Sequence, residues 1–83
     1  MHINNATISF PFGHPDMQLK VEYSGNYPVY IGLARAGAAT SAAEWKIKKI
    51  TYDTNYNVTA IQFAGGTNEY NAVWDSRAGY SYS

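Results

Sequence analysis

Cysteine is absent from the chain, so no disulfide framework holds the fold together. A chain of 83 residues buries only about 60 to 65% of the surface that it exposes when unfolded. The core must therefore be thin. Without cross-links, a core of this kind predicts that contacts with a partner chain add to the stability of the fold.

Charged residues are scarce and balanced. Six Lys and Arg residues oppose six Asp and Glu residues, and together they make up 14% of the chain, against about 25% in an average globular domain. Nucleic-acid-binding proteins carry a basic patch, and the nearest approach to one here is Lys46, Lys48 and Lys49. Three lysines on one strand are more often a solvated face or a guard against aggregation. We therefore expect no nucleic-acid partner.

Long apolar runs are also missing. No stretch approaches the ~20 apolar residues that a membrane-spanning helix needs. The first residues, MHINNATISF, lack the basic start and the apolar stretch of a signal peptide. We expect no membrane partner and a protein that is made and folded in a cytoplasm.

Few residues are suited to catalysis. The chain has two histidines, and its acidic residues are spread along the sequence without a local pairing of nucleophile and base. No glycine-rich loop has the context of a phosphate site. His14 and Asp16 flank a proline, and a weak metal site there is the alternative to two polar turn residues. We expect no enzymatic activity, no cofactor and no metal.

Tyrosine is what the chain has in abundance. Eight Tyr residues account for most of the 16% aromatic content. Each Tyr offers a rigid contact area and one hydroxyl, which suits a surface that is buried in an assembly. Aromatic residues are also favoured within strands. The composition alone leaves the interface and the internal packing as equal alternatives.

Two segments alternate clearly between apolar and polar residues. MQLKVEYS, residues 17–24, has the period of two that predicts a half-buried strand. In PVYIGLARA, residues 28–36, one face is apolar and the other is made small by Gly32 and Ala34. Small residues on one face of a strand indicate that a bulky side chain or another backbone approaches there.

Residues 41–53 are compatible with a helix or a strand. Ser41 and Glu44 have the spacing of a helical capping box, but a helix would scatter the lysines around its surface. As a strand, EWKIKKITYD changes its apolar phase at Lys48 and Lys49, and a β-bulge supplies such a shift. We favour the bulged strand. Its two apolar pairs are Trp45 with Ile47, and Ile50 with Tyr52.

Turn signals divide the chain at short, regular intervals. DTNYN, residues 53–57, joins EWKIKKITY, residues 44–52, to VTAIQFA in a long hairpin, and PFGHPD closes a first strand at Ala6–Phe10. NAVWDSRAGYSYS, residues 71–83, predicts a last strand with Tyr80 and Tyr82 on one face. Six or seven short strands predict an all-β fold, a small antiparallel β-sandwich or barrel, in a single domain spanning residues 1–83.

The last strand contains the residues that most resemble a site. We expect Trp74 to anchor it, and Asp75 and Arg77 to pair with each other or across strands. Exposed Trp or Tyr beside Asn and Asp is also typical of carbohydrate binding, here at Trp74 or around Asn55 and Tyr56. For Trp74, as for Trp45, we favour a core position.

Three stretches match a known kind of protein in order along the chain: PVYIGLARAGAATSAAEWKIKKITYD, NVTAIQFAGG and NAVWDSRAGYSYS. Together they resemble a family of small structural proteins encoded by tailed bacteriophages. The resemblance runs from Pro28 to Ser83, about two thirds of the chain, and leaves residues 1–16 unmatched. It implies a non-enzymatic virion protein, such as a capsid decoration (cement) protein, a head-fibre protein, or a neck or tail component.

The resemblance also sets the expected partners. They are a major capsid or tail/neck protein, together with further copies of the chain as a dimer or trimer within the virion. The leading hypothesis is a decoration protein that binds the capsid surface through Tyr-rich β faces. The alternatives are a tail or neck component and a small carbohydrate-binding module for host attachment. The expected interface residues are Tyr52, Tyr56, Trp74, Asp75, Arg77, Tyr80 and Tyr82.

Overall fold

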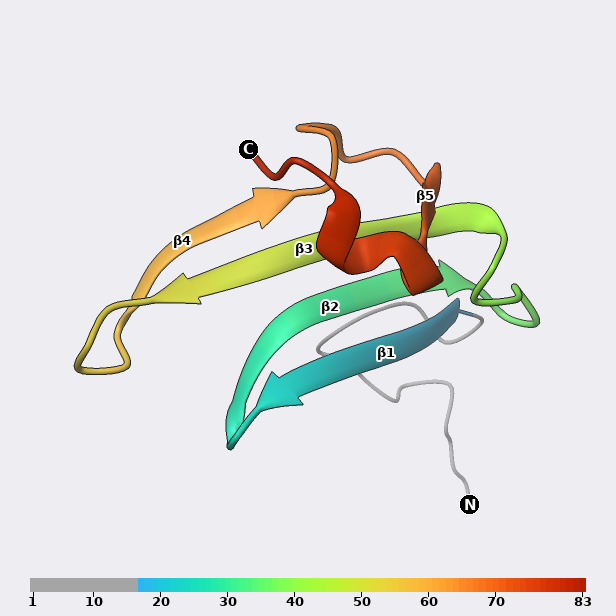
Figure 1. Cartoon of the computed structure of the whole chain (residues 1–83). Coiled ribbons are helices and arrows are strands. Elements are labelled where there is room, and N and C mark those ends of the chain that lie inside the picture. Colours follow the sequence, from blue (N-terminus) through green and yellow to red (C-terminus); the bar gives the residue numbers. More distant parts are fainter. Residues whose placement is uncertain (1–16) are drawn as a thin grey trace, which may run out of the picture.

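The computed structural model describes residues 17–83, which form five strands and one short 3-10 helix (Figure 1). The expected strand Ala6–Phe10 lies outside the described residues. The elements are β1 (Met17–Ser24), β2 (Tyr27–Arg35), β3 (Ala43–Tyr52), β4 (Val58–Phe63), β5 (Ala72–Val73) and the 3-10 helix η2 (Trp74–Gly79).

The strands form one antiparallel sheet in the order β1-β2-β3-β4, and β5 pairs with the beginning of β3. Residues 25–26 connect β1 to β2, residues 36–42 connect β2 to β3, and residues 53–57 connect β3 to β4, so segments that follow each other in the sequence pair directly. The prediction of a small all-β antiparallel fold is confirmed. Within residues 17–83 the sheet is open and not a barrel, which corrects that form of the prediction, because β1 at one edge does not pair with β4 at the other.

Strand β3 runs through the centre of the sheet, which confirms the strand and excludes the helix for this segment. The predicted bulge at Lys48 and Lys49 is wrong, because both residues pair in continuous register with β4. The register shifts lie instead between Ala43 and Trp45, opposite β5, and between Thr51 and Tyr52. The apolar phase changes because β3 buries Trp45 on one face of the sheet and Ile50 on the other.

One face of the sheet carries the hydrophobic core. We call it the tryptophan face, and it comprises Tyr30, Gly32, Ala34, Trp45 and Ile47, which the strand registers place on the same side. Helix η2 crosses over β2 and β3 on this side (Figure 1), and its Trp74 ring lies 5.7 Å from the Trp45 ring, centroid to centroid.

Gly32 gives Trp74 the room to approach the sheet. A Cβ atom on Gly32 would lie 2.5 Å from Cε3 of Trp74, closer than real Cβ contacts come, and 3.0 Å from Cε3 of Trp45, which is a tight contact. The small face that the sequence predicted on β2 is therefore confirmed. The bulky group that approaches it is an indole ring.

The C-terminal segment is only in part the strand that the sequence predicted. Residues Trp74–Gly79 form a 3-10 helix, which corrects the expectation of a continuous strand there. The last residues do pair: Ala64 bridges Tyr82 in antiparallel fashion, and the backbones of Phe63 and Ser83 exchange hydrogen bonds of 3.0 and 3.2 Å. The chain turns into a helix first because Trp74 must reach across the sheet to Gly32, and a strand beside β5 would not bring it there.

We expect Gly32→Ala to destabilise the fold by about 1 to 3 kcal/mol, because the added methyl group forces the indole of Trp74 out of its packed position. Urea unfolding gives the free energy. The matched control is Gly79→Ala, since a Cβ at Gly79 would meet nothing within 4 Å and should change stability by less than about 0.5 kcal/mol. Equal losses in the two variants would contradict this account of the core.

Candidate protein interface

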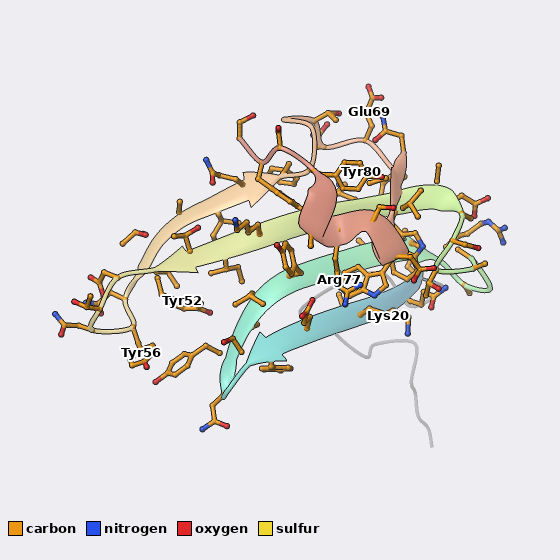
Figure 2. The ribbon with its side chains drawn as sticks, in the orientation of Figure 1. Lys20, Tyr52, Tyr56, Glu69, Arg77 and Tyr80 are labelled. Carbon is orange, nitrogen blue, oxygen red and sulfur yellow. The ribbon has the colours of Figure 1, made fainter. Side chains whose placement is uncertain are left out.

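The seven expected interface residues fall into two separate groups rather than one surface. Tyr52 and Tyr56 lie at the end of the β3–β4 hairpin, whereas Arg77 and Tyr80 lie in the C-terminal segment over the middle of the sheet (Figure 2). The second group also contains Trp74, Asp75 and Tyr82.

Most of the C-terminal group is engaged within the chain. Trp74 is buried at 7% exposure, and Tyr80 and Tyr82 pack, half-buried, against the core. The Tyr80 hydroxyl accepts a hydrogen bond of 2.8 Å from the backbone N–H of Val73. These aromatic rings therefore close the core over the tryptophan face, and Asp75 is the exposed member of the group.

Arg77 joins η2 to the edge strand β1. Its Nε donates to Oε1 of Glu22 at 2.6 Å, and its guanidinium lies 4.6 Å from the centroid of the Trp74 ring. The expected pair of Asp75 with Arg77 is therefore not formed, and Arg77 pairs with a strand from the helix rather than from a neighbouring strand. Asp75 does not take part, since its Oδ2 accepts a hydrogen bond of 3.2 Å from the Thr40 hydroxyl.

Tyr82 is held by a hydrogen bond and by burial. Its hydroxyl donates to the backbone oxygen of Arg77 at 2.7 Å. Burial, with a smaller effect of the neighbouring Tyr30 and Tyr80 phenols, raises the pKa of Tyr82 to about 12. The C-terminus is thus fastened to the helix by a phenol that strongly prefers its neutral form.

Three tyrosines join the β1–β2 turn to the β3–β4 turn, which lie at the same end of the sheet. The rings of Tyr27 and Tyr56 stack at 4.3 Å with an interplanar angle of 7°, and Tyr52 meets Tyr27 edge-on at 5.5 Å. Tyr52 also donates its hydroxyl to the Pro28 carbonyl at 2.8 Å. Tyr56 is 60% exposed, so one large aromatic ring is open to solvent at this end.

The turn that carries Tyr56 is organised by Asp53. The Oδ1 atom of Asp53 accepts from the backbone N–H groups of Asn55 and Asn57, at 2.8 and 2.9 Å. The bond from the Asn57 backbone is the main reason why the pKa of Asp53 lies below its usual value. This network supports the left-handed backbone of Tyr56, with φ of 63°. It also engages the Asp53 carboxylate and the Asn57 side-chain amide, two groups that could otherwise bind a sugar.

The opposite face of the sheet is the larger apolar surface, and sequence reasoning did not select it as a site. We call it the aliphatic face, and it comprises Leu19, Val21, Ile31, Leu33, Ile50 and Ile61, which the registers place on one side. Among residues 17–83, no helix or second sheet packs against it. Leu19 is 37% exposed and Ile61 57%. Solvent-exposed apolar side chains gathered on one surface indicate an interaction site.

A groove of about 240 Å³ lies at the hairpin end of this face, lined by Leu19, Val21, Tyr23, Pro28 and Ile31. The alternation in residues 17–24 correctly predicted which side chains share this side. It did not reveal that the side lacks a cover, because period two is the same for a half-buried strand and for a strand that awaits a partner.

Two lysines of β3 lie on the side of the aliphatic face. The Lys46 ammonium sits 4.7 Å from the centroid of the Tyr70 ring, and that of Lys48 sits 5.8 Å from the Phe63 ring. Neither takes part in the two ion pairs found within residues 17–83. The nearby Glu44 is already paired with Arg35.

Metal and membrane features can be stated only for the described part of the chain. Within it, no three His, Asp or Glu side chains gather as metal ligands would, and no helix is long and apolar enough to cross a membrane. His14 and Asp16 lie outside the described residues. The chain matches no protein-family model, no curated protein sequence and no solved structure.

We expect Arg77→Ala to lower the free energy of unfolding by about 1 to 3 kcal/mol, since it removes a charged hydrogen bond and the contact with the Trp74 ring. The matched control is Arg35→Ala. The Arg35 side chain is 64% exposed, against 27% for Arg77, and it meets Glu44 through an Nε–Oε1 distance of 2.7 Å and a long hydrogen bond of 3.4 Å from Nη2 to Oε2. A loss below about 1 kcal/mol is expected there, and denaturant titration that ranks Arg35 above Arg77 would refute the assignment.

The raised pKa of Tyr82 predicts a loss of stability at alkaline pH. The stabilisation is complete below the ordinary pKa of 10 and disappears as the pH rises through about 12. Tyr82→Phe should cost about 1 kcal/mol below pH 10, through the lost hydrogen bond. It should then lose less stability than the wild type between pH 10 and 12. Parallel pH profiles of the two proteins in urea unfolding would show that Tyr82 does not carry the effect.

Proposed function

We propose that the protein is a non-enzymatic structural component of a phage virion, a capsid decoration protein that binds the capsid surface through its aliphatic face. The observation that carries the proposal is the position of Leu19 and Ile61, exposed on a sheet face that no other described element covers. The resemblance of residues 28–83 to small phage structural proteins supports the virion as the setting.

Binding would come from contact area and not from chemistry. Burial of apolar surface contributes about 25 cal/mol per Å². Four strands spaced ~4.8 Å apart, each about eight residues long at ~3.3 Å per residue, present roughly 500 Å² in projection. A standard interface buries about 800 Å² on each partner. One copy alone therefore offers a small interface, and we expect several copies to bind side by side.

The lysines on this side define the chemistry of the partner. Lys46 and Lys48 lie among the aliphatic side chains on the central strand β3, in register with Leu33 and Ile31, and the nearby Glu44 is already bound to Arg35. Opposite-charge pairs across an interface favour one partner and one register over others. The capsid surface that fits is an apolar surface with carboxylates opposite these two lysines.

A tail or neck component would use the same face, and only location and copy number separate it from a decoration protein. The carbohydrate-binding alternative is narrowed to one place, because Trp74 is buried while Tyr56 remains exposed. At Tyr56 the polar groups of Asp53 and Asn57 bond to each other. A glycan panel with Tyr56→Ala as the control tests this alternative, and binding that Tyr56→Ala abolishes would favour it over assembly.

The test of the proposal is incorporation into virions of the phage that encodes the chain. Mass spectrometry of purified particles gives the copy number, which is high for a capsid decoration protein and low for a neck or tail component. We expect Ile61→Glu to lower incorporation at least about tenfold, because it places a charge in the apolar contact. Absence of the wild-type protein from virions would overturn the proposal.

The matched control is Thr51→Glu, at another exposed residue, which the register places on the tryptophan face. It should leave incorporation unchanged. Unfolding measurements on both variants separate binding from folding. If Ile61→Glu lowers stability and leaves incorporation intact, the aliphatic face is covered within the chain and does not bind the capsid.

A further inference from the structure

We propose that two copies of the chain pair through their β1 strands, antiparallel and centred on Val21, to form one continuous sheet. Four strands from each copy, β1 to β4, would make a sheet of eight. This surface is the edge of the sheet, and it is distinct from both of its faces.

Strand β1 has the features of a pairing edge. Among residues 17–83 it pairs only with β2, and it stands at the lower border of the sheet (Figure 1). Its eight residues contain neither proline nor glycine. Its one register shift against β2 lies between Glu22 and Tyr23, and the extra residue there is Val29 of β2, not a residue of β1. The backbone N–H and C=O groups on the outer side of β1 are therefore a template for another strand.

The sequence of β1 is complementary to itself in one register. When two copies run antiparallel with Val21 opposite Val21, Lys20 of each copy stands opposite Glu22 of the other, on the side of the tryptophan face. On the other side, Leu19 of each copy stands opposite Tyr23 of the other. The pairing thus makes two ion pairs on one side and a continuous apolar row on the other.

Neighbouring registers lose this match. A shift by two residues in one direction brings Lys20 opposite Lys20, and a shift in the other direction brings Glu22 opposite Glu22. Like charges directly opposite each other are destabilising. A shift by one residue brings apolar side chains onto the polar side. The charge pattern of LKVEY therefore selects the register that is centred on Val21.

The charged groups are in place for this pairing. Lys20 projects from β1 (Figure 2) and takes part in neither of the two ion pairs within residues 17–83. Glu22 is fixed by Arg77 through Oε1, and its side chain remains 42% exposed. A carboxylate that is held in position by one cation loses less side-chain entropy when it meets a second.

The dimer would join the aliphatic faces of the two copies into one surface about twice as large. Leu19 and Tyr23, which are exposed at the free edge, would then lie at its centre. The proposed dimer depends only on the edge strand β1 and its charge pattern. It can therefore be correct or wrong whether or not the protein binds a capsid.

Sedimentation velocity of the full chain over a range of micromolar concentrations tests the proposal. The wild type should show a concentration-dependent monomer–dimer equilibrium. Lys20→Glu places two pairs of like charges across the edge and should weaken the dimer at least about tenfold. Lys48→Glu, the same charge reversal on the central strand β3, is the control and should leave the dimer unchanged.

The decisive arm mixes two variants. Lys20→Glu and Glu22→Lys each oppose like charges in their own dimers, whereas a mixed dimer restores both ion pairs. Native mass spectrometry should show mainly the mixed dimer, with affinity near that of the wild type. Circular dichroism checks whether Glu22→Lys folds. If it does not fold, the comparison of Lys20→Glu with Lys48→Glu tests the dimer alone.

Three results would overturn the proposal. They are a wild type that stays monomeric throughout, a dimer that Lys20→Glu leaves unchanged, and two folded variants that fail to form the mixed dimer.

Discussion

The contact between Trp74 and Gly32 is the constraint on which the rest of the structure depends. The indole ring fills the place of the missing side chain and meets Trp45 beside it. Because Trp74 is the first residue of η2, this contact fixes where the helix begins. The helix in turn brings Arg77 over β1 and Tyr82 beside β4. One large side chain thus sets the course of the last ten residues.

A chain this small can complete only one side of its sheet with the elements described. The C-terminal segment is used on the tryptophan face, where two indoles and three tyrosines gather around small residues. The aliphatic face receives no such cover from residues 17–83. Ile50 shows the consequence, since it is buried on that side without belonging to the main core cluster. Of the six residues that define the aliphatic face only Ile50 is buried, and covering the others requires something beyond these elements.

Much of this fold was predictable from local pattern, and its site was not. The alternation in residues 17–24 and the small face at Gly32 follow from the two-residue period, which depends only on the strand itself. Helix η2 has no such signature, because a 3-10 turn of six residues is set by where Trp74 must pack. The bulge at Lys48 was wrongly placed for a related reason. A shift in the alternation of apolar residues along a strand arises from a bulge, but it arises equally when the strand buries residues first on one face of the sheet and then on the other.

The expected interface residues illustrate a general conflict in small proteins. Aromatic side chains suit both a core and an interface, and a chain without cross-links uses them first to complete its own core. Trp74, Tyr80 and Tyr82 are used in this way here. Aliphatic surface and a few charged side chains remain for recognition. Because the chain has so few charged residues, the position of each one strongly affects which partner and which register can bind. Glu22 is the telling case, since Arg77 ties the edge strand to the helix that Trp74 positions. A partner strand at β1 would therefore meet a carboxylate whose position is held by Arg77, which itself packs on Trp74.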